Sequence, residues 1–310
     1  MKLDKHLSDD EIIQVFKDWK KEHGRVYKDN EEMAKFAIFK ANLNYIIEFN
    51  ARKNSPSSYT LGLNMFADWS ENEFKETYLS CLDTSTDSDM PTNNVIELDR
   101  LPQPTPPLSL DWRVKQAMTD VKNQESCHGC WAFSTIGGIE GINAIDTKKL
   151  VSLSPQQLID CDTASKGCKE ADYPFKGQQG KCPDSKVKNS ATISSYVKLE
   201  EVEAALLNVV AVQPISVGVD ATGMIHYKKD SIYAGGNCKD TTNHAVLIVG
   251  YDSTKEGVDY WIVKNSWGKD WGNDGYIWIK RNTGLPNGVC GIHTRAYRPM
   301  KDKKEFKAQY

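Results

Sequence analysis

The sequence predicts an α+β protein, in which a helical half is followed by a β-rich half and a further helical domain precedes both. Helical periodicity runs through residues 8–50, a glycine-containing helix is expected over 131–145, and strand-like runs appear from residue 215 onward. A chain of 310 residues with 39% hydrophobic content can bury a core and divide into two or three domains. A cleft between the two halves is the natural place for a functional site.

Composition excludes several classes of partner. The formal net charge of −3 provides no broad cationic surface, so a nucleic-acid partner is not expected. We find no apolar stretch long enough to span a membrane, and we expect no membrane partner.

The N-terminal domain, placed at residues 1–81, carries two helix-start signals. Ser8-Asp9-Asp10-Glu11 and Ser70-Glu71-Asn72-Glu73 both have the form of a capping box. A second helix is expected over 30–52, and a short strand from Tyr59 to Phe66. One face of the second helix contains Glu31, Lys35, Phe39, Asn42, Ile46 and Asn50.

A change in composition marks the next boundary. Residues 82–107 are rich in Ser, Thr, Asp and Pro, which cannot pack a core and are typical of an extended linker. We therefore divide the rest into a linker or activation segment (82–107), a helical half (108–212), a β-rich half (213–300) and a solvated tail (301–310).

The two halves carry different periodicities. Gly137, Gly138 and Gly141 lie inside the expected helix, where each costs about 1 kcal/mol relative to Ala, so they predict close packing against another element. The strands of the second half are expected at Ile215 to Val219, Ala245 to Tyr251, Tyr260 to Lys264 and Tyr276 to Lys280.

A thiol, an imidazole and a carboxamide follow one another along the chain as Cys130, His244 and Asn265. A nucleophilic thiol needs a base that favours the thiolate, and that base needs a third group to hold its ring. Cys130 is also expected at a helix N-terminus, which lowers the pKa of a thiol. The pattern favours a thiol hydrolase.

Five motifs stand out in the sequence. Three surround the thiol, the imidazole and the carboxamide: the run from Gln124 to Ser134, Asn243-His244-Ala245, and Asn265-Ser266-Trp267-Gly268. The other two are the face of the second helix and Gly62-x-Asn64-x-Phe66-x-Asp68. Together they resemble the papain-like cysteine proteases and look closest to the cathepsin L-like enzymes of plants, in which the helix face is the ERFNIN prosegment motif, with Lys35 here in place of Arg, and the last is the second prosegment motif. The resemblance covers residues from about 8 to about 300. It implies a papain-like two-domain fold, a helical half plus a β-barrel-like half with the active-site cleft between them, behind a helical prosegment.

The resemblance also implies roles. Cys130 would be the nucleophile, His244 the general base and acid, and Asn265 the group that orients the imidazole. Trp267 would shield that hydrogen bond, and Gln124 would form the oxyanion hole with the backbone N–H of Cys130. The substrate pocket would be lined by Gly218, Asn243, Ala245 and Arg295, and Arg295 would favour acidic side chains or turn to solvent. The implied disulfides are Cys127–Cys168, Cys161–Cys182 and Cys238–Cys290.

A latent precursor is a further implication. The linker would run through the cleft, and cleavage near Thr105-Pro106 would release the mature chain. Acid would favour release because carboxylates such as Asp68 lose their pairing charge when protonated. The expected partners are peptide and protein substrates and cystatin-type inhibitors, with a monomeric protein and neither cofactor nor metal. Cysteine usage suits a vacuolar, lysosomal or extracellular location, although the charged residues at positions 1–6 are no signal peptide.

Other functions fit parts of the sequence. Cys127-x-x-Cys130 has the spacing of a redox pair, but a redox protein would leave His244 and Asn265 without roles. Metal binding is disfavoured because the remaining Cys and His are scattered. The serious alternative is a relative with an intact triad and a damaged substrate cleft.

Three departures from the family pattern favour that alternative. After Cys168 the family has Asn-Gly-Gly and a helix, and roughly twenty residues are absent here, beyond ordinary loop variation. Glu125 stands at a usual Gly, where a positive φ would strain it, and His128 either crowds the neighbouring subsite or lies in solvent.

Overall fold

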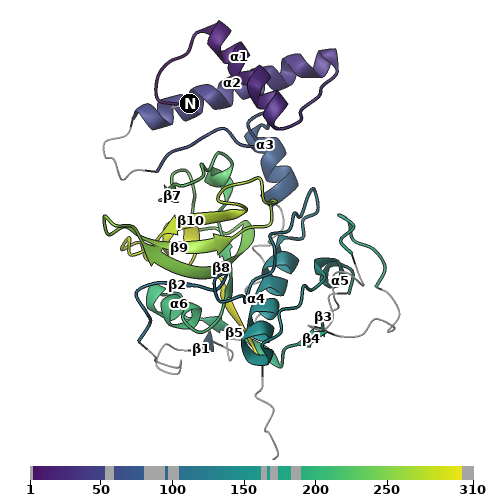
Figure 1. Cartoon of the computed structure of the whole chain (residues 1–310), viewed down its shortest axis with the longest axis vertical. Helices are drawn as coiled ribbons and strands as arrows, with labels where there is room; N and C mark the ends of the chain where they lie inside the picture. The colour runs from purple at the N-terminus through teal and green to yellow at the C-terminus, as the bar shows by residue number, and fades with distance from the viewer. Residues whose placement is uncertain are drawn as a thin grey trace, which may run out of the picture.

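The computed structural model describes residues 3–52, 59–79, 95–96, 105–161, 166–167, 174–182 and 190–301. Cys81, Cys168, most of the predicted linker and all but the first residue of the tail lie outside this part of the chain. The described residues form a helical N-terminal region at one end of the molecule and a two-part body beneath it (Figure 1).

Two helices make up the N-terminal region. They are α1 (Asp9–Glu22) and α2 (Asp29–Ala51), and the first predicted capping box is present because Ser8 and Glu11 bond each other's backbone. The helices pack through buried aromatic side chains, with the Phe16 and Trp19 rings 5.0 and 5.2 Å from that of Phe39. The helical periodicity therefore predicted both elements correctly.

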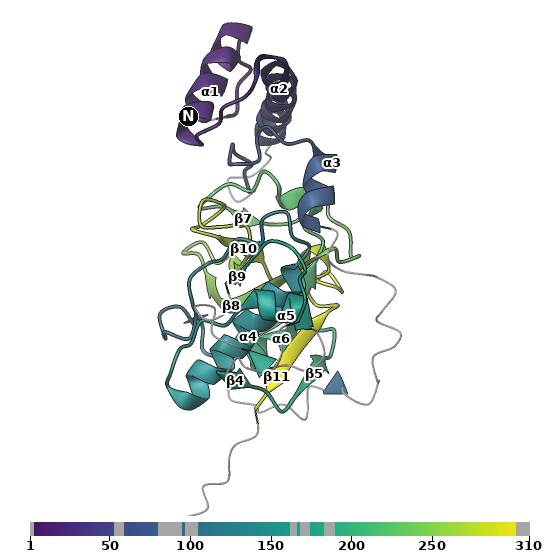
Figure 2. The same ribbon diagram turned by 90° about the vertical axis from the view of Figure 1, so that its right-hand side faces the viewer.

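A short helix, α3 (Glu71–Phe74), leads from this region to the body of the molecule. Its Ser70–Glu73 capping box is present, and it continues as a π-helical turn over Lys75–Leu79. In both views α3 lies between the N-terminal helices and the sheet (Figures 1 and 2).

The predicted strand from Tyr59 to Phe66 is wrong. Leu61 makes only an isolated bridge, to Tyr227. The side chain of Asn50 takes both the N–H and the C=O of Leu61, at 3.0 Å each, and Asn64 Oδ1 accepts the N–H of Phe66. These local bonds occupy backbone groups that a strand ladder would need.

In the described part of the chain, the body of the molecule contains the α-helices α4 (Cys130–Thr147), α5 (Pro155–Cys161) and α6 (Glu203–Val210), besides two 3-10 turns at Thr222–Met224 and Val289–Gly291. The glycines inside α4 bring it close to the sheet, as predicted. A Cβ at Gly137 would lie 2.7 Å from the Leu247 side chain, and one at Gly141 would lie 2.7 Å from Pro214. The helix is therefore held against strand β8 at a distance that a larger side chain would prevent.

A nine-stranded sheet forms the other part of the body, with strand order β1-β5-β11-β6-β8-β9-β10-β7 and β2 paired on β8. A separate pair joins β3 to β4. The bounds are β1 (Val95–Ile96), β2 (Leu110–Asp111), β3 (Lys166–Gly167), β4 (Ala191–Thr192), β5 (Ser195–Leu199), β6 (Ile215–Val219), β7 (Ile232–Tyr233), β8 (His244–Ser253), β9 (Asp259–Lys264), β10 (Tyr276–Lys280) and β11 (Ala296–Met300).

The four predicted strands correspond to β6, β8, β9 and β10. Strands β2 and β5 also join the sheet, although they come from the stretch 108–212 that the sequence predicts to be helical. Gly250 permits the β2 contact, because a Cβ there would lie 2.2 Å from the carbonyl oxygen of Leu110. The topology places His244 at the first position of β8 and Asn265 directly after β9.

The described helices include none that is long and apolar enough to cross a membrane. The described residues also contain no group of three or more His, Cys, Asp or Glu side chains placed to hold a metal ion.

Candidate active site

The predicted catalytic residues meet where the start of α4 faces the start of β8. Cys130 is the first residue of α4 and is completely buried. Its Sγ accepts a hydrogen bond from the backbone N–H of Ala245 at 3.2 Å, so the sulfur lies beside the residue that follows His244. Residues more than a hundred positions apart are thus brought into contact by the packing of one helix on one strand.

The imidazole of His244 is held by the neighbouring segment. Its Nε2 lies 2.8 Å from Asn265 Oδ1, and the ring of Trp267 is 4.9 Å from the imidazole. All three side chains are buried. Burial lowers the pKa of His244 to about 4, against the smaller opposing effect of the bond to Asn265. The imidazole is therefore neutral in this covered state of the site.

Gln124 is anchored beside the thiol by both its backbone and its side chain. Its N–H donates to Ser266 O at 2.7 Å, and its Oε1 accepts from Ser266 Oγ at 2.5 Å. The Nε2 group contacts two carbonyl oxygens, that of Cys127 at 3.3 Å and that of Tyr78 at 3.4 Å. The side chain predicted to bind an oxyanion is therefore already engaged by the N-terminal region.

Aromatic residues of the N-terminal region cover this site. The rings of Phe66, Phe74 and Tyr78 lie 5.9, 5.1 and 5.9 Å from that of Trp267. Each pair is edge-to-face, the arrangement that aromatic rings prefer. Trp267 thus contacts the imidazole with one part of its ring and the N-terminal region with another.

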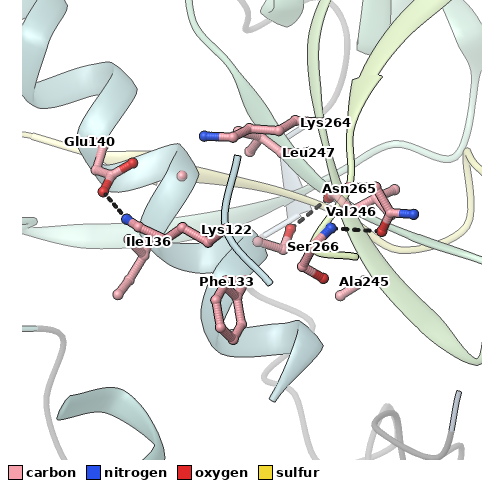
Figure 3. A pocket seen from close by; sticks show the side chains of 12 residues that line it. Lys122, Phe133, Ile136, Glu140, Ala245, Val246, Leu247, Lys264, Asn265 and Ser266 are labelled. Carbon is pink, nitrogen blue, oxygen red and sulfur yellow. Dashed lines mark hydrogen bonds and ion pairs between the residues drawn. The ribbon is translucent and has the colours of Figure 1, made fainter. Parts of the chain in front are cut away.

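A buried polar network supports the segment that carries Gln124. The carboxylate of Glu140 on α4, 1% exposed, accepts from Thr119 Oγ1 at 2.6 Å, Lys122 Nζ at 2.9 Å and Leu153 N at 2.7 Å. Lys264, the last residue of β9, donates to Thr119 O at 2.7 Å. Figure 3 shows the Lys122–Glu140 pair on one side of a small pocket and Asn265 and Ser266 on the other. The network joins Glu140 and Thr119 of the helical half to Lys264 of the β-rich half.

Sequence reasoning did not find this network. The sequence does place a glutamate, Glu140, among Ile and Gly in the middle of a helix that is expected to pack closely. A carboxylate is almost never fully buried unless it is paired, so this position could have predicted a polar partner. Ser266 and Tyr78 were also missed, because their contacts with Gln124 depend on the fold.

The cysteines differ from expectation at one pair. Cys161–Cys182 and Cys238–Cys290 are both present. The predicted Cys127–Cys168 pairing is wrong, because Cys127 is a free, buried thiol, whereas Cys130 is disulfide-bonded. The partner of Cys130 lies outside the described residues. Cys127 and Cys130 are three residues apart, so one further cysteine can pair with either sulfur.

The predicted substrate-pocket residues separate into two groups. Gly218 on β6 is opposite Ala245 in the register, and its N–H donates to Arg295 O at 2.9 Å, so these three residues lie side by side. The Asn243 side chain instead donates to Asp220 Oδ1 at 2.8 Å and accepts from the N–H of Ala221 at 2.9 Å. Asn243 therefore stabilises the turn after β6.

The two unusual residues near the thiol have different environments. Glu125 has φ of 50°, in the left-handed region that favours glycine, so the predicted strain is present. His128 is exposed, which agrees with the second of its two predicted environments, exposure to solvent.

The order of the thiol, imidazole and carboxamide, the two-part fold and the covering N-terminal region define a thiol protease with its own inhibitory segment. The chain belongs to the papain family of cysteine proteases, which it matches over residues 106–171 and 168–300. Residues 16–74 match the cathepsin propeptide inhibitor domain. The protein is accordingly a cysteine peptidase, a thiol endopeptidase made as a precursor.

Plant enzymes and their precursors are among its relatives. The P34 probable thiol protease of Glycine max is 42% identical, over 98% of this chain and 87% of that protein. A recombinant stem bromelain precursor of known structure is 36% identical, with a TM-score of 0.80 over 94% of this chain and all of that one. The Carica candamarcensis cysteine protease CMS1MS2, solved in complex with E-64, is 36% identical, with a TM-score of 0.57 over 64% of this chain and all of that one.

The alignments agree with a chain that is shortened relative to the family. The family match consists of two parts that overlap at residues 168–171, next to the predicted departure after Cys168. The alignment with the Glycine max protein extends over 333 residues, more than the 310 of this chain. Gaps in this chain account for the difference.

Proposed function

We propose that Cys130, His244 and Asn265 hydrolyse peptide bonds, with Gln124 as an oxyanion donor and Trp267 shielding the His244–Asn265 bond. The observation that carries this assignment is the hydrogen bond from the Ala245 N–H to Cys130 Sγ, one residue from an imidazole bound to Asn265 Oδ1. These two bonds support the proposal because a nucleophilic thiol needs a base close by and that base needs an orienting group.

The proposed reaction proceeds through a thioester on Cys130. His244 accepts the proton of the Cys130 thiol, and the thiolate attacks the peptide carbonyl carbon. Gln124 Nε2 and the Cys130 N–H donate to the resulting oxyanion, and one such donor is worth about 10²–10³ in turnover. His244 then protonates the leaving amine, and water, deprotonated by His244, hydrolyses the thioester to free the acid and the thiol.

Reduction precedes this chemistry. A sulfur in a disulfide cannot act as the nucleophile, and Cys130 is disulfide-bonded in this structure. We infer that an external thiol reductant, which is oxidised as Cys130 is reduced, is needed before the first turnover.

Residues 1–81 keep the site latent in our proposal. The Tyr78 carbonyl engages Gln124 Nε2, and three aromatic rings cover Trp267. Cleavage near Thr105-Pro106 separates this prosegment and the linker 82–107 from a mature chain with a helical half (108–212) and a β-rich half (213–300). Exposure supports the cleavage position, since Leu108 is 94% exposed just before β2.

We propose that Arg295 sets specificity at the pocket formed with Gly218 and Ala245. A Cβ at Gly218 would lie 3.1 Å from Arg295 Cβ, so the arginine side chain starts directly beside the position left open by the glycine. A guanidinium there favours an acidic side chain at the second substrate residue before the cut. A substrate panel varying that residue tests the role, and a preference for Leu and Phe that Arg295→Ala leaves unchanged would contradict it.

A weaker enzyme is the second candidate, and the division of the family match at 168–171 favours it. Turnover requires the peptide to be held in position at the thiol, and lost main-chain contacts reduce it by about 10²-fold or more. Iodoacetamide needs no peptide groove, so reduced Cys130 in the processed chain should be alkylated readily while peptide turnover stays low. Equal turnover with the family-length loop restored would remove this candidate.

We propose peptide and protein substrates, cystatin-type inhibitors as partners, a monomeric state and a vacuolar, lysosomal or extracellular location. The two disulfides support an oxidising compartment.

Self-processing tests the proposed function. The reduced full chain is incubated at pH 4–5, and its mass is followed with time. Wild type should shorten toward a product beginning near residue 106, and Cys130→Ala should keep its full mass. Equal shortening of the two proteins would overturn the assignment of Cys130.

A further inference from the structure

The prosegment binds three consecutive residues of the peptidase through their backbone. Asn64 Nδ2 donates to Ile225 O at 2.7 Å, the Gly62 N–H donates to His226 O at 3.0 Å, and Leu61 forms an antiparallel bridge with Tyr227. His226 is therefore at the centre of the docking contact. It is remote in sequence from the catalytic motifs and has no role in the reaction described above.

The side chain of His226 is closed in at this contact. It is 4% exposed, its ring lies 6.4 Å from that of Tyr45 on α2, and its Nδ1 has no hydrogen-bond partner among the described residues. A neutral imidazole tolerates this environment better than a charged one, because burying an unpaired charge is costly.

The surrounding groups offer no compensation for a charge. Tyr45 faces the ring from α2. Burial, together with the negative charge of Glu71 on α3, raises the pKa of Tyr45. On the peptidase segment itself, the Lys228 side chain lies against Gly62. Burial is the only cause that lowers the pKa of His226, to about 4 from an ordinary value of 6.5.

We propose that His226 is the acid-sensing residue of the docking interface: it takes up a proton as the pH falls and thereby loosens the prosegment. The inference rests on the proposed latency of residues 1–81. It assigns the sensor to the peptidase side of the interface.

The direction of the pH effect follows from the difference between the pKa of His226 in the docked state and in the free state. A histidine held neutral in the docked state supports full docking above its free pKa of 6.5, and this support is lost as the pH falls from there toward about 4. Between pH 7 and pH 5 the docking equilibrium should weaken by roughly 20-fold.

Asp68 is the competing sensor suggested by the sequence. Its carboxylate is 2% exposed and bonds Tyr27 Oη, with Arg25 Nε at 3.9 Å. These partners all belong to the N-terminal region, so protonation of Asp68 would loosen that region internally. Of these two groups, His226 is the one that lies at the contact with the peptidase.

Hydrogen exchange of the Gly62 amide, corrected for intrinsic rates, measures this contact in the full chain carrying Cys130→Ala, which cannot process itself. The protection factor should fall roughly 20-fold from pH 7 to pH 5. Adding His226→Phe should make it nearly independent of pH. Adding His293→Gln, at a histidine that is 3% exposed and outside the docking contact, should leave the fall unchanged.

An equal fall with His226→Phe, or no fall in the parent chain, would overturn the proposal. If His226→Phe does not fold, His226→Gln takes its place. An NMR titration of His226 provides a second criterion: a midpoint near 6.5 while Gly62 stays protected would also overturn it. Because the chain carries Cys130→Ala, these outcomes are independent of peptidase activity, which the mass assay tests separately.

Discussion

The body of the peptidase and the prosegment contact are held by different kinds of interaction. In the peptidase, the buried carboxylate of Glu140 pairs with the partly buried Lys122, and two disulfides cross-link the chain. At the prosegment contact, aromatic packing on Trp267 and neutral backbone bonds around His226 predominate. We therefore expect the N-terminal region to separate without breaking the ion pair and the disulfides of the peptidase.

The largest expected effect separates the two thiols at the start of α4. Cys130→Ala should reduce turnover of the processed enzyme by at least about 10⁴-fold, because it removes the nucleophile. Cys127→Ala, the matched control, should retain turnover within about threefold, since a free thiol outside the reacting set contributes little. Peptide hydrolysis under reducing conditions measures both. Equal losses would favour the redox interpretation of the Cys-x-x-Cys spacing.

The ion pair between Glu140 and Lys122 should account for the next effect. Glu140→Gln removes the charge partner of the partly buried Lys122 and should lower the free energy of unfolding by about 3 kcal/mol. Glu48→Gln breaks an exposed pair with Arg52 and should cost about 0.5 kcal/mol or less. Urea unfolding of the two variants measures the difference. Similar midpoints would show that the Glu140–Lys122 pair contributes no more to the free energy of unfolding than an exposed pair does.

Phe66→Ala should weaken the free energy of docking between the prosegment and the peptidase by about 3 kcal/mol, because it removes a fully buried ring from the cluster on Trp267. Opening of the cover should then speed iodoacetamide alkylation of reduced Cys130 at pH 7. Val26→Ala, at a residue that is 91% exposed, is the control and should change nothing. Unaltered alkylation in Phe66→Ala would mean that the aromatic cluster does not close the site.

The smallest effect concerns backbone strain beside the thiol. Glu125→Gly should raise the free energy of unfolding by about 1 kcal/mol, because glycine adopts a φ of 50° without the cost borne by a side chain. Lys17→Gly, in the middle of α1, should lower it by about the same amount. A destabilised Glu125→Gly would show that the glutamate side chain makes a compensating contact.

The comparison also explains what the sequence could predict. Local signals predicted both capping boxes, the glycine-mediated packing of α4 and the four strands β6, β8, β9 and β10. The assignment of Cys130, His244 and Asn265 stays a prediction, which the sequence offers because these residue types follow a family order. The Tyr59–Phe66 strand failed because the side chains of Asn50 and Asn64 capture its backbone groups. The position of His226 under α2 depends on packing between distant segments, which no local pattern contains.

Latency of a cysteine peptidase under a removable cover is tested most directly by peptide turnover on either side of prosegment removal. The reduced full chain is assayed at pH 7 on a fluorogenic peptide, then again after an added protease has cut the linker and residues 1–81 have been separated, with Cys130→Ala in parallel. Turnover should appear only after separation and only with Cys130 present. Equal turnover before and after separation, or turnover that survives Cys130→Ala, would contradict the account.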